Sequence, residues 1–360
     1  MPPRVLIVDD SVVARAVLSR LIDAGDRFMV AGAVGSVAAA LDFLGRTRVD
    51  ILLLDVNMPG VDGLTALPQL IAAGRGARIV VVSSSVGDGA AATVQALAMG
   101  AADTLVKPDT AALTSAFGRT LLDRLDRLID RSPAGTGIVM EPAASPSRKS
   151  VAPPPGLPAT VAADRSFDLV AIGASTGGIH ALGQLLGRLP ATFRAPVLVT
   201  QHLPAAFMPY FAAQLATISG RPCDVAEDRM RIRPGRLIVA PGDAHLRCVA
   251  LGERGGDRGA AVKLSTAPAV SGCLPSVDPM LASLAAIYGE RLLAIVLSGM
   301  GRDGAEGAGH VRAAGGRVIV QDQASSVVWG MPGAVVAADR ADAVLTPAAI
   351  RTLLVGGEAR

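Results

Sequence analysis

A serine lies at a glycine-flanked turn, at Ser175 in the sequence GASTGG. The apolar residues 169–172 before it predict a buried strand, and a helical pattern begins near Ile179. A hydroxyl at such a strand-to-helix turn is accessible, and the N–H groups of the helix start lie close by. A serine nucleophile and its oxyanion need both features. A phosphate-binding glycine loop or a plain tight turn is the competing interpretation, although a P-loop lysine is missing.

Two further residues are candidates to activate this serine. His202 follows a predicted strand at 196–200, and Asp303 follows another at 292–297. Parallel strands present their carboxyl ends at one edge of a sheet, where α/β proteins place their sites. The spacing therefore permits Ser175 as nucleophile, His202 as base and Asp303 as the group that orients the imidazole.

Other pairings stay open on spacing alone. The sequence also fits the G-x-S-x-G elbow of α/β-hydrolases, in which the acid precedes the histidine. That order would pair Ser175 with Asp243 or Asp278 and with His310, although His310 falls within a predicted helix.

Three more side chains could lie near the serine. His245 follows a strand end and could line the cleft, and nearby Cys248 is a possible thiol nucleophile. We expect His180, which falls in the first turn or so of the helix after the serine, to face solvent.

A second group of reactive side chains lies in the amino-terminal third. Asp9 and Asp10 end the first predicted strand, Asp55 ends the third, Ser83 the fourth, and Lys107 follows the fifth. Three carboxylates that converge on one pocket repel each other, and a divalent cation with oxygen ligands, such as Mg²⁺, relieves that repulsion. Asp55 could then attack a phosphoryl donor while the metal and Lys107 neutralise the developing charge.

The elements that position these groups form two α/β patterns. Both predict doubly wound parallel sheets with sites at the strand carboxyl ends. The first has predicted strands at 4–8, 28–33, 50–54, 78–82 and 104–106 and helices at 11–24, 37–44, 64–73, 90–99 and 111–129. The second has strands at 169–172, 196–200, 236–240, 292–297 and 317–320, a hairpin at 246–251 and 261–265, and helices at 179–188, 208–219, 279–288, 304–314 and 347–355. We predict domains at 3–130 and 166–356, joined by a Pro/Ala/Ser-rich linker at 131–165.

Composition narrows the class of protein. The 360 residues are 51% hydrophobic but only 3% aromatic, which suits buried parallel strands built from aliphatic side chains. The net charge of +3 comes from scattered arginines and does not predict nucleic-acid binding. Cys223, Cys248 and Cys273 form no CxxC pair, which favours free thiols in a reducing compartment. No apolar run approaches membrane-spanning length, so we expect a cytoplasmic protein without direct membrane insertion.

The first pattern resembles a known family. Asp9-Asp10, the run D-x-N-M-P-G-x-D-G from Asp55, Ser83 and Lys107-Pro108 match the receiver domain of two-component response regulators, a flavodoxin-like fold. The resemblance implies phosphorylation on Asp55 and Mg²⁺ bound by Asp10, Asp55 and the Asn57 carbonyl, with Asp9 supporting. It also implies that Ser83 follows the phosphoryl group and that Lys107 pairs with it. The family often has an aromatic residue at the position of Thr104.

The second pattern carries the motifs G-A-S-T-G-G-x-x-A-L, Q-H-x-P, A-P-G-x-x-H-L, P-S-V-D, L-[ST]-G-M-G-x-D-G and Q-D-x-x-S-S-V-V-x-G-M-P in order. With the amino-terminal receiver, the chain resembles the CheB family of bacterial chemotaxis receptor methylesterases. The resemblance implies a Rossmann-like three-layer α/β domain with the triad Ser175, His202 and Asp303. It places oxyanion residues at Thr176 and at the Met300 N–H, and His245 in a cleft-shaping motif.

The resemblance also implies an activity and partners. The implied reaction is hydrolysis of glutamate γ-methyl esters on methyl-accepting chemoreceptors, which releases methanol, with linked deamidation of receptor glutamines. It needs no cofactor in the esterase domain, and the histidine kinase of the chemotaxis system is the implied phosphodonor.

Regulation and two rival functions remain to be tested. We hypothesise that the unphosphorylated receiver packs over the Ser175 cleft through a modest, partly polar interface. A receiver with a DNA-binding effector is the rival class, but no helix-turn-helix with basic residues is evident. A hydrolase of small esters also stays open.

Overall fold

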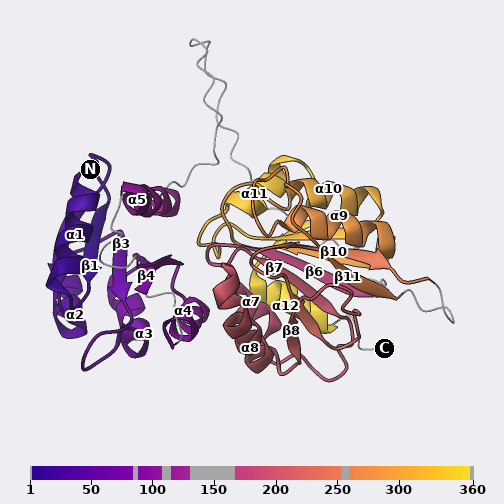
Figure 1. Ribbon diagram of the computed structural model, residues 1–360, viewed down its shortest axis with the longest axis horizontal. Helices are drawn as coiled ribbons and strands as arrows, with labels where there is room; N and C mark the ends of the chain where they lie inside the picture. Colours follow the sequence, from indigo (N-terminus) through magenta and orange to yellow (C-terminus); the bar gives the residue numbers. More distant parts are fainter. Residues whose placement is uncertain (1, 84–87, 108–114, 130–166, 253–258, 357–360) are drawn as a thin grey trace, which may run out of the picture.

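The computed structural model describes residues 2–83, 88–107, 115–129, 167–252 and 259–356 (Figure 1). The predicted linker at 131–165 and most of the hairpin loop ERGGDRG lie outside the described residues. Within them, no helix combines the length and the apolar character needed to cross a membrane.

The amino-terminal domain alternates strands and helices throughout. Its elements are β1 (Arg4–Val8), α1 (Val12–Asp23), β2 (Met29–Val34), α2 (Val37–Arg46), β3 (Ile51–Asp55), α3 (Gly63–Gly74), β4 (Arg78–Ser83), α4 (Asp88–Met99), β5 (Asp103–Val106) and α5 (Ser115–Ile129). The strands form one parallel sheet in the order β2-β1-β3-β4-β5. This is the predicted doubly wound sheet, and the start of predicted helix 111–129 falls partly outside the described residues.

Strand alternation builds the two faces of this sheet. In β1, Leu6 and Val8 join the apolar cluster under α2, α3 and α4, whereas Val5 and Ile7 join the cluster under α1 and α5. Each face is apolar because each is covered by helices, as parallel sheets require. Polar side chains are therefore excluded from the strand middles and gather at the carboxyl ends.

The carboxyl-terminal domain is larger. Its elements are β6 (Leu169–Ala174), α7 (Gly178–Leu186), β7 (Val197–Gln201), η1 (Ala205–Phe207), α8 (Met208–Ser219), β8 (Cys223–Val225), β9 (Leu237–Val239), β10 (His245–Ala250), β11 (Ala260–Ser265), α9 (Val277–Tyr288), η2 (Gly289–Arg291), β12 (Leu292–Val296), α10 (Ala305–Ala313), β13 (Arg317–Gln321), α11 (Gly330–Ala337), β14 (Ala343–Leu345) and α12 (Pro347–Gly356). The seven-stranded sheet is parallel and has the order β14-β13-β12-β6-β7-β9-β8.

Three layers result in this domain, as predicted (Figure 1). Helices α7, α8 and α12 cover one face, and α9, α10 and α11 cover the other together with the antiparallel hairpin β10-β11. The chain builds outward from β6 to β7 on one side and later from β12 on the other. The order therefore reverses between β6 and β12, which is where open α/β sheets bind ligands.

Most predicted elements are present, with ends shifted by one or two residues. The prediction missed the strands β8 and β14 and the helix α11. Both strands have three residues, are only partly buried and lie at the two edges of the sheet. Helix α11 includes Gly330, Pro332 and Gly333, residue types that argue against a helix in sequence.

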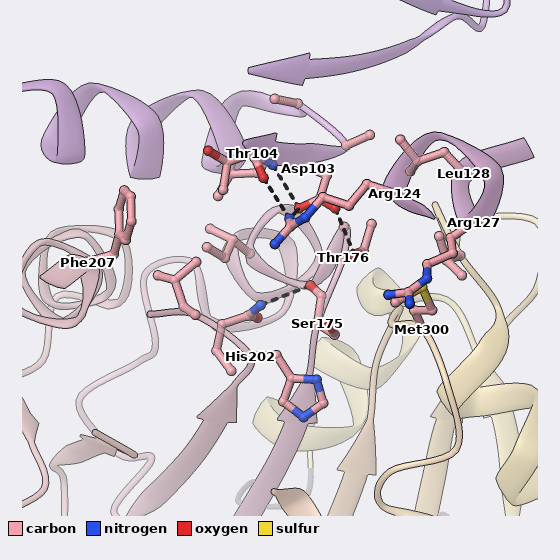
Figure 2. A pocket seen from close by; sticks show the side chains of 18 of the residues that line it. Asp103, Thr104, Arg124, Arg127, Leu128, Ser175, Thr176, His202, Phe207 and Met300 are labelled. Atoms are coloured by element: carbon pink, nitrogen blue, oxygen red, sulfur yellow. Dashed lines mark hydrogen bonds and ion pairs between the residues drawn. The ribbon is translucent and has the colours of Figure 1, made fainter. Parts of the chain in front are cut away.

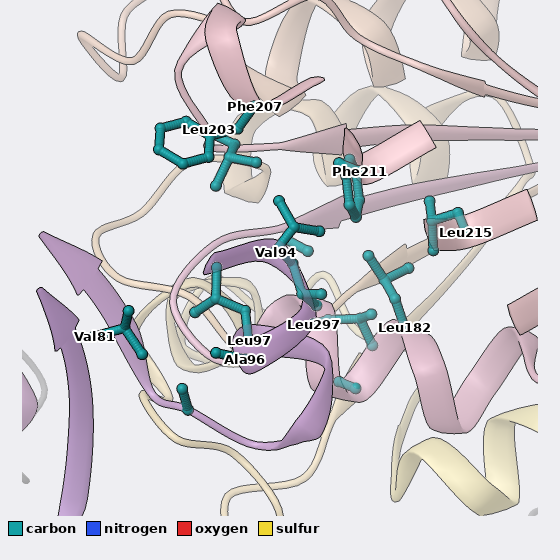
Figure 3. Packing of buried hydrophobic residues seen from close by; sticks show 14 of the residues in the cluster. Val81, Val94, Ala96, Leu97, Leu182, Leu203, Phe207, Phe211, Leu215 and Leu297 are labelled. Carbon is teal, nitrogen blue, oxygen red and sulfur yellow. The ribbon is translucent and has the colours of Figure 1, made fainter. Parts of the chain in front are cut away.

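The two domains share an apolar contact (Figure 3). Helix α4 packs against α7, α8 and η1, and Val94 and Leu97 of α4 belong to the same buried cluster as Leu182, Phe207 and Phe211. A partly polar interface is the usual character of contacts between domains. The centre of the contact is apolar because α4 is apolar on two sides, one facing its own sheet and one facing the other domain.

Candidate active site

Ser175 lies directly after β6, at the point where the strand order reverses. Its N–H donates to the Ser298 carbonyl at 3.0 Å, and its carbonyl accepts from Gly178 N–H at 2.8 Å and Gln201 Nε2 at 3.0 Å. These bonds fix the backbone of the turn and leave the hydroxyl in the cleft. Gly177 has φ +77°, and a Cβ there would lie 2.5 Å from Val327, so the turn requires glycine.

His202 and Asp303 meet beside this turn. His202 follows β7, the neighbour of β6, and its N–H donates to the Ala174 carbonyl at 3.0 Å. Its Nε2 lies 2.7 Å from Asp303 Oδ2. Burial alone would lower the pKa of His202, but the hydrogen bond and charge of Asp303, with a smaller effect of Cys273, raise it to about 9. The pair therefore favours the imidazolium state, which a histidine reaches when it takes a proton.

Asp303 is almost completely buried and is surrounded by donors. Oδ1 accepts from Ser276 Oγ at 2.7 Å and from Gly304 N–H at 3.1 Å, and Oδ2 accepts from Val277 N–H at 2.8 Å. Burial would raise the pKa of Asp303, but His202 and these donors outweigh it and hold the pKa well below its usual value. The carboxylate is thus fixed as an anion next to His202.

Ser175 and His202 reach the same cleft from adjacent strands (Figure 2). Among the hydrogen bonds between described residues, none joins the Ser175 hydroxyl to His202. Catalytic hydrogen bonds are often long without substrate and tighten when it binds. The arrangement can support acyl transfer through a serine, with a histidine base and a buried carboxylate behind it.

The cleft is closed on one side by the amino-terminal domain (Figure 2). Residues from β5 and α5, among them Asp103, Thr104, Arg124 and Arg127, line the same cavity as Ser175, Thr176, His202 and Met300. Gly177 N–H donates to the Ala102 carbonyl at 3.1 Å, and Thr176 Oγ1 lies 3.5 Å from Asp103 Oδ2. An N–H at the helix start next to Ser175 is therefore bonded to a receiver carbonyl.

Asp103 is held in this contact by Arg124, whose Nη1 lies 2.9 Å from Asp103 Oδ1 and 2.7 Å from the Thr104 carbonyl. Burial raises the pKa of Asp103 more than Arg124 lowers it. The interface thus combines its apolar centre with one buried carboxylate whose charge is partly compensated.

The amino-terminal carboxylates also converge. Lys107 Nζ lies 2.6 Å from Asp55 Oδ2 and 2.7 Å from Asp9 Oδ2, and single carboxylate oxygens of Asp9, Asp10 and Asp55 lie within 4.8 Å of one another. Burial raises the pKa of Asp55 and outweighs the bonds from Lys107 and from Asn57 N–H, which lies 3.0 Å from Oδ1. Oxygen donors of this number and charge fit Mg²⁺.

Ser83 is the last residue of β4, and its side chain lies outside the described residues. Thr104, at the usual aromatic position, is buried in β5, and its carbonyl accepts the bond from Arg124. Of the residues predicted to meet at this edge of the sheet, Asp9, Asp55 and Lys107 are in contact through the two Lys107 ion pairs.

The remaining histidines do not reach Ser175. His245 is buried, accepts from Ser276 N–H at 2.9 Å and contacts the Ala267 carbonyl, so it shapes the loop behind Asp303. His310 is exposed on α10. The expectation that His180 faces solvent was wrong, because its Nδ1 contacts the Ala98 carbonyl of α4 at 3.1 Å.

The two further aspartates and the cysteine considered with Ser175 are poorly placed to act on it. Asp243 is exposed, and Asp278 contacts Gly307 N–H and lies behind Asp303. Burial raises the pKa of Cys248 to about 12, which makes it a poor nucleophile at neutral pH.

Ser276 is the functional residue that sequence reasoning missed. It lies in the motif P-S-V-D, from which no contact with Asp303 was predicted, whereas its hydroxyl donates to Asp303. A serine that precedes an expected helix start was the available signal.

Comparisons with known proteins agree with this geometry. The CheB methylesterase family model matches residues 170–354, and the response regulator receiver domain model matches residues 5–117. The chain is 40% identical over 357 residues to protein-glutamate methylesterase/protein-glutamine glutaminase 1 of Paramagnetospirillum magneticum, which covers 95% of this chain and 92% of the relative. It is 39% identical over 344 residues to the similarly named protein 2 of Caulobacter vibrioides, covering 95% of each.

A solved structure supports the assignment of the carboxyl-terminal half. The CheB methylesterase catalytic domain of Thermotoga maritima is 36% identical, with a TM-score of 0.50 over 53% of this chain and 98% of that chain. The match of the family models, the relatives along almost the whole chain and this structure lead to one conclusion. The chain belongs to the CheB methylesterase family and carries an amino-terminal response-regulator receiver domain.

Proposed function

We propose that this protein is a phosphorylation-regulated protein-glutamate methylesterase and protein-glutamine glutaminase acting on chemoreceptors. The observation that carries the proposal is the His202–Asp303 contact at 2.7 Å beside Ser175, at the strand-order reversal. The names of the relatives supply the substrate class, since they are protein-glutamate methylesterases/protein-glutamine glutaminases. The position of the amino-terminal domain over the Ser175 cleft supports regulation.

In the proposed reaction Ser175 Oγ attacks the ester carbonyl of a glutamate γ-methyl ester while His202 takes its proton. The oxyanion is held by backbone N–H groups, for which Gly177 at the turn and Met300 in the loop between β12 and α10 are the candidates, with Thr176 beside Gly177. His202 then returns the proton to the methoxide, which leaves as methanol. Water, deprotonated by His202, attacks the glutamyl ester and releases glutamate and Ser175. A glutamine would follow the same steps and release ammonia.

Asp303 orients the imidazole and stabilises its positive charge in this scheme. Its donors, Ser276 Oγ and Val277 N–H, keep it ionised and fixed, so it does not compete for the proton. No step in the esterase domain uses a metal or an organic group.

The receiver domain would control access to Ser175. We propose that Asp55 accepts a phosphoryl group from the histidine kinase of a chemotaxis system. Asp9, Asp10, Asp55 and the Asn57 carbonyl would hold Mg²⁺, which supplies positive charge for phosphoryl transfer. Lys107 would then exchange its Asp55 contact for a phosphoryl oxygen, and the Ser83 hydroxyl would move toward the phosphoryl group. Strand β5 connects Lys107 at one end to Ala102 and Asp103, which contact the other domain, at its other end. A movement of Lys107 would therefore be passed along β5 and weaken the domain contact.

Methanol release from methylated chemoreceptor membranes tests the proposal. We expect release by the full chain, a rise with a small phosphodonor plus Mg²⁺, and loss in Ser175→Ala. Ser326→Ala is a matched control, since Ser326 is a buried serine on the loop before α11. Hydrolysis of free small esters without receptor demethylation would overturn the substrate assignment. Methanol release at the same rate with and without the phosphodonor would overturn only the proposed regulation.

A further inference from the structure

A cysteine lies beside the His202–Asp303 pair. Cys273 is partly buried in the loop between β11 and α9, and its Sγ, a ring nitrogen of His202 and a carboxylate oxygen of Asp303 all lie within 4.8 Å of one another. The proposed esterase mechanism assigns nothing to this thiol. The three atom types together are ligands that zinc prefers.

The loop that carries Cys273 is bonded to the surroundings of Asp303. Cys273 N–H donates to Ser271 Oγ at 3.3 Å, Ser271 Oγ donates to Ser276 Oγ at 3.0 Å, and Ser276 Oγ donates to Asp303 Oδ1 at 2.7 Å. Such hydrogen bonds behind the ligands fix their positions and strengthen metal binding. The thiol is therefore held near the imidazole by a short chain of hydroxyl groups.

We propose that His202, Cys273 and Asp303 form a binding site for a thiophilic divalent cation, Zn²⁺, which inhibits the esterase reversibly. Tetrahedral zinc separates its sulfur, nitrogen and oxygen ligands by about 3.3–3.6 Å, so the Cys273 sulfur needs to approach the other two atoms by no more than about 1.5 Å. His202 Nε2 and Asp303 Oδ2, which lie 2.7 Å apart, move apart slightly to admit the ion. Water fills the fourth position. The Cys273 side chain is only partly buried, which leaves it room to rotate toward the ion.

The proton balance of this step is simple. The Cys273 thiol and the His202 imidazolium each lose one proton to solvent, and His202 keeps its other proton on the nitrogen that does not bind zinc. Zinc then occupies one lone pair of the imidazole and the proton occupies the other, so His202 cannot accept the Ser175 proton. Binding strengthens as the pH rises, because zinc displaces protons from its ligands. The effect on activity rests on the proposed function, but the binding does not.

Cobalt binding to the full-length protein tests the site directly. Mg²⁺ in excess keeps the oxygen ligands of Asp9, Asp10 and Asp55 occupied, and Co²⁺ is then titrated while the near-ultraviolet thiolate-to-cobalt absorption is measured. We expect a saturable band that Zn²⁺ displaces. Cys273→Ser should lose the band and at least about 100-fold in affinity, because loss of a ligand should cost no less than the roughly 10- to 100-fold typical of a residue behind the ligands.

Cys223→Ser is the matched control, because Cys223 is also partly buried but lies in the edge strand β8. It should keep the band. His202→Gln should weaken binding without removing the thiolate. A band that is unchanged in Cys273→Ser, or lost equally in Cys223→Ser, overturns the site.

Methanol release separates this inference from the proposed function. Zn²⁺ should inhibit the wild type and inhibit Cys273→Ser about 100-fold less strongly. An active enzyme without a Cys273-dependent band refutes the zinc site alone. A Cys273-dependent band in a protein without esterase activity refutes the proposed function alone.

Discussion

Two buried carboxylates, Asp55 and Asp303, have pKa values that are shifted in opposite directions. Both follow parallel strands at the carboxyl edge of a sheet. Asp55 has one lysine and one N–H against two neighbouring aspartates, and its pKa is raised. Asp303 has four hydrogen-bond donors besides His202, and its pKa is lowered. Both groups are buried, so the hydrogen bond and charge of His202, together with the larger number of donors around Asp303, account for the difference.

This difference suits the proposed roles. A carboxylate with free oxygen lone pairs and poor charge compensation can take up a cation and a phosphoryl group. A carboxylate that already accepts from several donors is suited to holding its neighbour in place. Position at a strand end creates a site, and the donors around the carboxylate determine its chemistry.

Asp303→Asn should produce the largest effect on this comparison. The amide can no longer accept the imidazole proton in the same orientation, and we expect kcat to fall about 10⁴-fold. Asp278→Asn is the control, because Asp278 lies next to Asp303 but does not contact His202. Methanol release measures both variants. A similar loss in each would show that local packing, not the Asp303 charge, supports His202.

The pH profile should reveal the raised pKa of His202. A general base works when neutral, so kcat/KM should rise with pH through the His202 pKa of about 9 and not through its ordinary value near 6.5. Between pH 7 and 9 the rise should be about 50- to 100-fold for a single titration. A plateau already reached at pH 7.5 would contradict the ion pair in the unphosphorylated enzyme.

Asp55→Asn should abolish stimulation by a phosphodonor. Coupling between distant sites is typically worth about 5- to 150-fold, and we expect wild-type stimulation in that range. The control is Asp42→Asn, whose carboxylate contacts only Arg46 on the surface of α2 among the described contacts. Comparing methanol release with and without the phosphodonor gives the ratio for each protein. Stimulation that persists in Asp55→Asn would place the phosphoryl group elsewhere.

Ser276→Ala should have the smallest effect. It removes one of the donors to Asp303 while four contacts remain, and a hydrogen bond to a charged group contributes about 1.5–3 kcal/mol. We expect kcat to fall about 10-fold with KM nearly unchanged, and the low-pH limb of the profile to move. Ser271→Ala, one bond farther away, should lose less. Equal losses would indicate a loop collapse.

Much of both domains was predictable because apolar runs and glycine turns are local signals. The runs around Ile7, Leu53 and Ile172 are buried on both faces and are distinct in sequence. The edge strands β8 and β14 are not, because three half-buried residues have no detectable period. The pairing of His202 with Asp303 followed from strand ends meeting at one sheet edge.

The domain contact was beyond the reach of a single sequence. An apolar helix such as α4 covers its own sheet, and nothing in its pattern shows that Leu97 also belongs to one buried cluster with Phe207. The roles of Ser276 and Cys273 depend on the path of an irregular loop, which has no periodic signal. His180 was misjudged for the same reason as the domain contact, since its partner Ala98 belongs to the other domain.

The bond from Gly177 N–H to the Ala102 carbonyl makes the receiver a tethered competitor of the substrate carbonyl under the proposed mechanism. A covalent tether gives such a competitor an effective concentration on the order of millimolar. A receptor ester must therefore displace the Ala102 carbonyl, whose effective concentration does not fall when the protein is diluted. Loosening the contact should lower the apparent KM for receptor more than it changes kcat. Phosphorylation would then raise the rate most when methylated receptor is scarce.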